Sequence, residues 1–287
     1  MGICTQEYWK FVYICDKMDA GFFYWPACSA CFYMKYETVL ERQIGEMKNI
    51  TVKDIVNATG GFLLCGDEDT PIKGLCIDSR KAQAGDLFIP LLGNKVDGHR
   101  FIEPAMERAS ATLTSEHDNV VISEKPFIRV DDTMKALQAI GKDIRGRYDI
   151  PYIGVTGSVG KTTTREMIAA AVGTGRHCFQ TNGNENSQIG VPMTLSRMTD
   201  GYDAAVIEMG ISEPGQMEIL SDIVRPSICV VTMIGVAHIE FMKTQENIRD
   251  EKLSIVNHMK ENGLLLLNGD DPLLREIKDD MSCQTLT

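Results

Sequence analysis

The sequence has little positive charge for its length and no long apolar run. Its 287 residues carry 29 Lys and Arg against 40 Asp and Glu, a formal net charge of −11. Nucleic acids and anionic membranes are recognised by clustered Lys and Arg, so this balance argues against both partners. No stretch reaches the roughly 20 apolar residues of a transmembrane helix, and the first ten residues lack the basic start of a secretory signal. We therefore expect a cytoplasmic monomer that binds no nucleic acid and does not insert into membranes.

Internal repeats and low-complexity tracts are also absent, but residues 1–46 differ in composition from the rest. Four of the nine cysteines lie in the first 31 residues, among many aromatic side chains. We interpret residues 1–46 as an atypical extension before a start at Met47. The alternative is a zinc site, for which one Cys-x-x-Cys pair is a weak signal; its ligands would be Cys4, Cys15, Cys28 and Cys31. For the chain as a whole, reduced thiols suit an α/β nucleotide-binding protein.

The chain is long enough, and with 44% hydrophobic residues apolar enough, for two domains. In residues 47–149, short apolar runs at 74–77, 87–92, 120–122 and 127–130 alternate with helix-like segments near 101–109 and 133–147, which predicts a small α/β domain. Pro151 disfavours a continuing helix and marks the boundary. Residues 150–287 contain four apolar runs that alternate with helices, which predicts a mainly parallel sheet covered by helices on both faces. We expect these strands at 152–155, 204–208, 228–232 and 264–267, and helices near 162–172, 215–223 and 245–262.

A phosphate-binding loop follows the first of these strands. It reads Thr-Gly-Ser-Val-Gly-Lys-Thr-Thr and opens a helix-like run. Its glycines let backbone N–H groups approach oxyanions, its lysine reaches terminal phosphates, and the threonine after the lysine can ligate Mg²⁺. The generic loop has a further glycine where this chain has Val155, so the loop is a variant. We predict that ATP contacts Thr156, Gly157, Ser158, Val159, Gly160, Lys161, Thr162 and Thr163.

Three ionisable side chains follow or flank later elements. Glu208 ends an apolar strand, where open α/β sheets place ligands, and we expect it to ligate Mg²⁺. His238 follows the strand that ends at Thr232 and, taken alone, is typical of an ordinary turn residue. Lys252 lies in a helix beside two acidic residues and, taken alone, is typical of a surface salt bridge.

Three polar segments have no clear secondary-structure pattern. Residues 181–192 are rich in asparagine and glycine, which suits a loop that hydrogen-bonds a polar ligand. Asp78-Ser79-Arg80 follows a predicted strand, and Asp97-Gly98-His99 precedes a predicted helix. For these last two, a solvated turn and a ligand site remain equally open.

Together these motifs resemble the Mur ligases, the ATP-dependent amide-forming enzymes of peptidoglycan precursor synthesis. The resemblance covers most of residues 48–274, and the Thr-Gly-x-x-Gly-Lys-Thr-Thr loop is the family's form. It implies that the first domain binds a UDP-sugar. Within the family, the segments around 184–192 and 234–240 resemble the branch that adds D-alanyl-D-alanine. The ligase that adds meso-diaminopimelate or lysine would carry a Thr-Thr-Pro motif after the phosphate loop, and that motif is absent. The implied substrate-binding residues are Ser79, Arg80, Asp97, His99, Asn184, Asn186 and Ser187.

The resemblance also implies a mechanism and its catalytic residues. ATP phosphorylates the terminal carboxylate of UDP-N-acetylmuramoyl-tripeptide, and the amine of D-alanyl-D-alanine attacks the acyl phosphate. Lys161 binds the β- and γ-phosphates, Thr162 and Glu208 hold one Mg²⁺, and His238 binds a second. Lys252 matches the position that several relatives carbamylate. Asn268 resembles the segment that contacts adenine and ribose.

The chain ends at Thr287, whereas the family continues into a third, Rossmann-like domain. We therefore expect the chain to bind the sugar peptide and ATP but to ligate poorly alone, and we expect residues 279–287 to be a frayed end. Alternatives are another Mur-type ligase, or a phosphate-loop module that forms no amide. The folylpolyglutamate ligase is disfavoured, because it lacks the UDP-sugar module.

Overall fold

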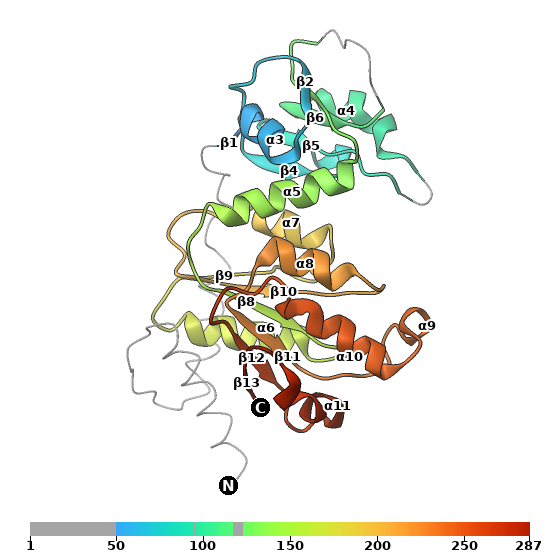
Figure 1. Ribbon diagram of the computed structural model, residues 1–287. Helices are drawn as coiled ribbons and strands as arrows, with labels where there is room; N and C mark the ends of the chain where they lie inside the picture. The colour runs from blue at the N-terminus through green and yellow to red at the C-terminus, as the bar shows by residue number, and fades with distance from the viewer. Residues whose placement is uncertain (1–49, 94–95, 117–122) are drawn as a thin grey trace.

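The computed structural model describes residues 50–93, 96–116 and 123–287. The proposed extension, the four cysteines of the alternative zinc site and a strand expected at 120–122 lie outside these residues. Two sheets form separate layers, and the long helix α5 (Thr133–Gly146) lies between them (Figure 1). The fold class is α/β, as predicted. Within the described residues, no helix is both long and apolar enough to cross a membrane.

The first domain is built on a five-stranded sheet in the order β2-β7-β6-β5-β4. Its strands pair in parallel except for β2 and β7. Helix α3 (Val52–Thr59) begins at Thr51 with a capping box to Asp54 and ends at Gly60, which has φ 65°; both signals are readable in the sequence. The strands are β2 (Phe62–Cys65), β4 (Gly74–Cys76), β5 (Asp86–Phe88), β6 (Ala111–Thr114) and β7 (Phe127–Arg129).

Shorter elements complete this domain. Strands β1 (Ile50–Thr51) and β3 (Pro71–Ile72) form a separate antiparallel pair. One face of the domain core joins α3, the sheet and the apolar side of α5. The remaining elements are η1 (Ser79–Lys81), η2 (Gly98–Phe101) and α4 (Ile102–Met106).

The second domain contains an entirely parallel six-stranded sheet in the order β13-β12-β11-β8-β10-β9. Successive side chains of a strand point to opposite faces, so Ile153 and Val155 pack with α6 (Lys161–Val172) while Tyr152 packs on the other face. Helices α7 (Gly190–Leu195), α8 (Gln216–Val224) and α10 (Gln245–Leu253) cover that second face. The strands are β8 (Tyr152–Thr156), β9 (Cys178–Gln180), β10 (Ala204–Glu208), β11 (Ile228–Val231), β12 (Leu264–Leu267) and β13 (Gln284–Leu286).

The order of these strands fixes where a ligand can bind. Strand β8 lies between β10 and β11, so the connections after these strands leave the sheet beside one another at its carboxyl edge. Open parallel sheets bind ligands at such a reversal of strand order. The short helices α9 (Ile239–Met242) and α11 (Pro272–Glu276), with η3 (Ser254–Val256) and η4 (Lys278–Asp280), follow later strands.

Three predicted boundaries were wrong. Residues 279–287 are not a frayed end, because β13 pairs in parallel with β12 at the edge of the sheet. The asparagine-rich loop is shorter than predicted, because α7 already begins at Gly190. The helix expected up to Asn262 ends as α10 at Leu253 and continues only as the 3₁₀ turn η3.

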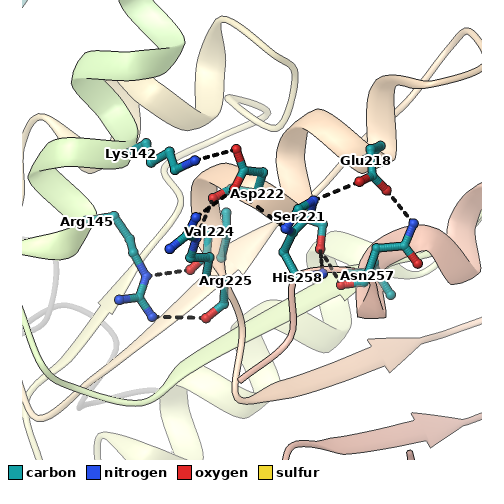
Figure 2. Close-up of polar contacts among 10 residues, drawn as sticks. Lys142, Arg145, Glu218, Ser221, Asp222, Val224, Arg225, Asn257 and His258 are labelled. Carbon is teal, nitrogen blue, oxygen red and sulfur yellow. Dashed lines mark hydrogen bonds and ion pairs between the residues drawn. The ribbon is translucent and has the colours of Figure 1, made fainter. Parts of the chain in front are cut away.

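Helix α5 is anchored to the second domain by its C-terminal half (Figure 2). The Arg145 guanidinium donates to the backbone oxygens of Val224, at 2.6 Å, and of Arg225, at 2.9 Å, and it lies 4.2 Å from the centre of the Tyr152 ring. Lys142 forms an ion pair of 2.6 Å with Asp222 on α8. The described parts of the two domains therefore share this helix.

Candidate functional site

The phosphate loop connects β8 to α6 at the carboxyl edge of the six-stranded sheet. Gly160 has φ 85° and precedes the first turn of α6 without a side-chain cap, which leaves that turn open to an anion. Gly157 has φ 147°, and a Cβ there would lie 1.9 Å from Thr232 Oγ1. Only glycine fits this position, because a larger residue would clash with Thr232. That the loop glycines let backbone N–H groups approach phosphate oxygens stays a prediction.

Two groups hold the loop in shape. Thr232 Oγ1, at the end of β11, donates to the backbone oxygen of Val159 at 2.6 Å. Lys161 Nζ donates to the backbone oxygen of Gly157 at 2.9 Å. The hydroxyls of Thr156 and Ser158 are buried without a hydrogen-bond partner among the described residues, so the loop has unsatisfied polar groups that a phosphate could engage.

Glu208 is buried, with 1% of its surface exposed. Its Oε2 accepts from Thr162 Oγ1 at 2.9 Å and lies 3.3 Å from Arg165 Nη1. Its Oε1 accepts from Asn186 Nδ2 at 2.7 Å. Burying a polar group is costly unless it is hydrogen-bonded, and these donors meet both carboxylate oxygens. The carboxylate therefore joins the phosphate helix to the asparagine-rich segment.

The asparagine-rich segment meets the phosphate loop at this point. The backbone oxygen of Asn186 also accepts from Gly210 N at 2.7 Å, which fixes Asn186 on both sides. Ser187 is exposed and its Oγ accepts from Gly190 N at 3.2 Å. Asn184 is also exposed.

A cavity of about 370 Å³ opens in front of these groups. Four residues predicted from the sequence line it, namely Lys161, Asn186, Ser187 and His238. Met134 from the first turn of α5 forms part of the wall, so both domains contribute to it. Gln188 and Ile189 also line the cavity and fall within the predicted ligand loop 181–192. The remaining lining residues, which no motif singled out, are Gly210, Ile211, Ser212 and Gln216.

Lys252 is buried, with 2% of its surface exposed, and is not a surface salt-bridge lysine. Burial, and then the positive charge of Lys161, lower its pKa to about 8, while Glu251 acts in the opposite direction. Glu251 instead caps α8, since its carboxylate accepts from the backbone N–H groups of Gly215 and Met217, each at 2.9 Å. An amine of this pKa is partly neutral near physiological pH.

His238 and Asn268 lie on loops at the same edge of the sheet. His238 is exposed and has φ 66° at the start of α9. Asn268 is exposed after β12, and its Oδ1 accepts from Asp270 N at 3.0 Å. Sequence reasoning missed Asp271, which is buried and accepts from Ile234 N at 2.6 Å. Asp271 therefore ties the His238 loop to the segment that contains Asn268.

The four residues predicted in the first domain lie apart from the residues that line the cavity. Arg80 is exposed and pairs with Asp78, whose pKa falls to about 2 mainly because of that hydrogen bond; Ser79 is half-buried beside it. The His99 ring is buried, with Nδ1 2.7 Å from Asp97 Oδ1 and Nε2 accepting from Ser115 N at 3.0 Å. Both ring nitrogens of His99 are thus engaged within the domain.

The donor set at the phosphate loop fits Mg²⁺. A threonine hydroxyl and a carboxylate are hard oxygen ligands, and Mg²⁺ bound to a nucleotide needs only one or two protein ligands. Among the described residues, the single group of three clustered His, Cys, Asp or Glu side chains is Asp97, His99 and Glu116, in the first domain. Glu208 and His238 are therefore not assembled into one three-ligand cluster.

Comparisons with known proteins find family models that match both domains. The family model for the Mur ligase middle domain matches residues 155–287, and the model for the Mur ligase family catalytic domain matches residues 71–145. The chain belongs to the Mur ligase family. It is 41% identical over 239 residues to the UDP-N-acetylmuramoyl-tripeptide–D-alanyl-D-alanine ligase of Bacillus subtilis, and 31% identical over 226 residues to that of Escherichia coli.

Solved structures of Mur ligases share the fold. MurF from Acinetobacter baumannii has a TM-score of 0.76 at 29% identity, covering 82% of this chain and 52% of that protein. MurF from Thermotoga maritima, solved with ADP, has a TM-score of 0.68 at 32% identity, covering 76% of this chain and 50% of that protein. The Bacillus alignment covers 83% of this chain and 52% of the relative, and the Escherichia alignment 78% and 49%. The chain thus spans about half the length of these Mur ligases.

Proposed function

We propose that this chain provides the acceptor-binding and ATP-binding parts of a ligase that adds D-alanyl-D-alanine to UDP-N-acetylmuramoyl-tripeptide. The observation that supports this most is the convergence of Lys161, the Thr162–Glu208 pair and Asn186 at one edge of the sheet. In this proposal residues 47–149 bind the UDP-sugar peptide and residues 150–287 bind ATP. The similarity to UDP-N-acetylmuramoyl-tripeptide–D-alanyl-D-alanine ligases supports this choice of acceptor and dipeptide.

The proposed reaction is a phosphoryl transfer followed by amide formation. The γ-phosphoryl group of ATP passes to the terminal carboxylate of the acceptor, and the dipeptide amine then displaces phosphate to give the amide, ADP and phosphate. Lys161 offers positive charge to the β- and γ-phosphates, and Asn268 contacts the nucleoside. Thr162 and Glu208 would hold one Mg²⁺ and His238 a second, and these ions would neutralise charge that develops on the phosphoryl oxygens.

The acceptor side has its own set of proposed contacts. Asn184, Asn186 and Ser187 reach the acceptor from the second domain, while the first domain contributes Ser79, Arg80, Asp97 and His99. Lys252 lies near Lys161, and its neutral amine is the form that carbamylation requires. A carbamate there would replace a buried positive charge by a negative one near the metal ligands.

Calorimetric titration of UDP-N-acetylmuramoyl-tripeptide into the chain tests this proposal. We expect saturable binding that UDP-N-acetylglucosamine does not reproduce, because the peptide contacts extend beyond the UDP-sugar. Asn186→Asp is the informative variant, since it places a second carboxylate against Glu208 without changing size. If a folded chain binds nucleotide but not the sugar peptide, the activity is that of a nucleotide-binding module and the ligase proposal fails.

A further inference from the structure

Arg165 contacts both halves of the proposed site. It lies on α6, three residues after Thr162, and residues at this spacing share one face of a helix. Its residue exposure is 3%, so its charge must be met within the protein. Three groups meet it, namely the carboxylates of Glu208 and Glu166 and the backbone oxygen of Gly183.

One nitrogen of the guanidinium makes the two contacts of interest. Arg165 Nη1 lies 2.8 Å from the Gly183 backbone oxygen and 3.3 Å from Glu208 Oε2. Gly183, with φ 55°, begins the turn that leads into Asn184 and Asn186. The Arg165 side chain thus contacts both Glu208, the proposed Mg²⁺ ligand, and the turn at Gly183 that precedes the proposed acceptor-binding residues.

The second partner of Arg165 provides a matched control. Arg165 Nη2 pairs with Glu166 Oε1 at 3.0 Å, and the Glu166 side chain is 39% exposed. Among the described residues, the Glu166 carboxylate itself makes no hydrogen bond or ion pair with Glu208 or with the asparagine-rich segment. Exposed pairs contribute little to stability, whereas removing one partner of a buried pair has a large effect.

We propose that Arg165 is a positioning residue that couples the nucleotide site to the acceptor site, acting through Glu208 and the backbone of Gly183. The inference rests on the proposed function. A ligand that draws Glu208 toward a metal ion moves the carboxylate relative to Arg165 Nη1. The hydrogen bonding of Nη1 is then redistributed between Glu208 and the Gly183 backbone oxygen. The position of residues 183–187 therefore depends on whether the nucleotide and Mg²⁺ are bound.

Hydrogen exchange on the ligand-free chain tests the structural link without any substrate. The backbone N–H groups of Glu185 and Asn186 are held by bonds within the segment, to Asn182 and Asn184. In Arg165→Met we expect their exchange to quicken at least about tenfold, because the turn at Gly183 loses the Arg165 donor to its backbone oxygen. In Glu166→Gln we expect wild-type exchange. Unchanged exchange in a folded Arg165→Met protein would overturn the inference.

A binding cycle then tests the coupling. The acceptor affinity of the wild type is compared with and without a non-hydrolysable ATP analogue and Mg²⁺, and we expect at least about a fivefold difference. This ratio should fall toward one in Arg165→Met and persist in Glu166→Gln. If both variants keep the wild-type ratio, the coupling role is wrong although the ligase proposal stands. If the wild type binds neither ligand, the proposed function fails as well.

Arg165→Lys serves if the methionine variant does not fold. It keeps a cation beside Glu208 but has a shorter reach to the Gly183 backbone oxygen. We expect faster exchange in residues 183–187 in this variant too, by a smaller factor than in the methionine variant. Wild-type exchange in Arg165→Lys, together with an unfolded methionine variant, would mean that Arg165 only balances the charge of Glu208.

Discussion

Two ionisable side chains at the site, Glu208 and Lys252, are buried, but within the described part of the chain only the Glu208 side chain has hydrogen-bond partners. Glu208 receives donors from Thr162, Arg165 and Asn186, whereas no ion pair or hydrogen bond to the Lys252 ammonium is found among the described residues. Desolvation is the larger cause of the lowered pKa of Lys252, and Lys161 adds repulsion. The lysine is therefore held in the fold at a cost in stability, which is expected of a functional group.

The cost predicts that Lys252→Met stabilises the protein at pH 7. The gap between a pKa of 10.5 in the unfolded chain and about 8 in the folded one corresponds to roughly 3 kcal/mol. Below pH 8 the Lys252 amine is protonated in both the folded and the unfolded state, so the full destabilisation by its burial applies. As pH rises from 8 to 10.5 the unfolded chain keeps its proton longer, so wild-type stability rises and the advantage of the variant shrinks. Urea unfolding in bicarbonate-free buffer at several pH values measures this.

The exposed Lys260 offers a control for this prediction. It pairs with the fully exposed Asp149, so Lys260→Met should change stability by less than about 1 kcal/mol at each pH. A Lys252→Met protein that is less stable than the wild type at pH 7 would mean that the ammonium has favourable partners in the fold.

At the scale of elements, apolar runs predicted four of the six strands described in the second domain. The bounds of β10 and β12 are those expected, and β8, β11 and α6 differ from expectation by one residue at one end. The edge strands β9 and β13 were not predicted, because each has three residues, which is too few for a periodic pattern. The pattern also could not place side chains, because burial of Lys252 and the contacts of Arg165 depend on packing between distant segments.

Local motifs in the sequence singled out candidate site residues, but they did not predict which distant residues contact them. The phosphate loop and Glu208 follow from local motifs. The Asp271 contact to the His238 loop and the Thr232 contact to Val159 join segments that are 37 and 73 residues apart. No local spacing rule reports such contacts, and no alignment of relatives was needed to recognise the loop itself.

Helix α5 gives the second prediction, at its anchor on the second domain. Arg145→Met removes the donor of two backbone oxygens at the end of α8 and the contact with the Tyr152 ring (Figure 2). We expect the free energy of unfolding to fall by about 2–4 kcal/mol, because the buried backbone oxygen of Val224 loses its donor.

Lys142→Met, one turn earlier on α5, is the matched variant. Its ion pair with Asp222 joins two side chains that are 40% and 33% exposed, so we expect a loss below about 1 kcal/mol. Both variants are compared by chemical denaturation at one pH. Equal losses in the two would show that the carbonyl contacts of Arg145 do not anchor the helix.

At the scale of the whole molecule, α5 brings the first domain to the carboxyl edge of the second. Its first turn contributes Met134 to the cavity that Lys161 and Asn186 also line, while its last turns are fixed to α8. A ligand in this cavity therefore contacts both domains. The account depends on one claim above the others, that this edge of the sheet holds the triphosphate of a nucleotide with Mg²⁺.

The measurement that tests this claim most directly is equilibrium binding of a non-hydrolysable ATP analogue, with and without Mg²⁺, to the wild type and to Lys161→Met. We expect saturable binding to the wild type that Mg²⁺ strengthens, and at least about a hundredfold loss in the variant, because the lysine is the loop's cation for the terminal phosphates. Equal affinity of the two proteins, both folded, would contradict the claim and place the nucleotide elsewhere.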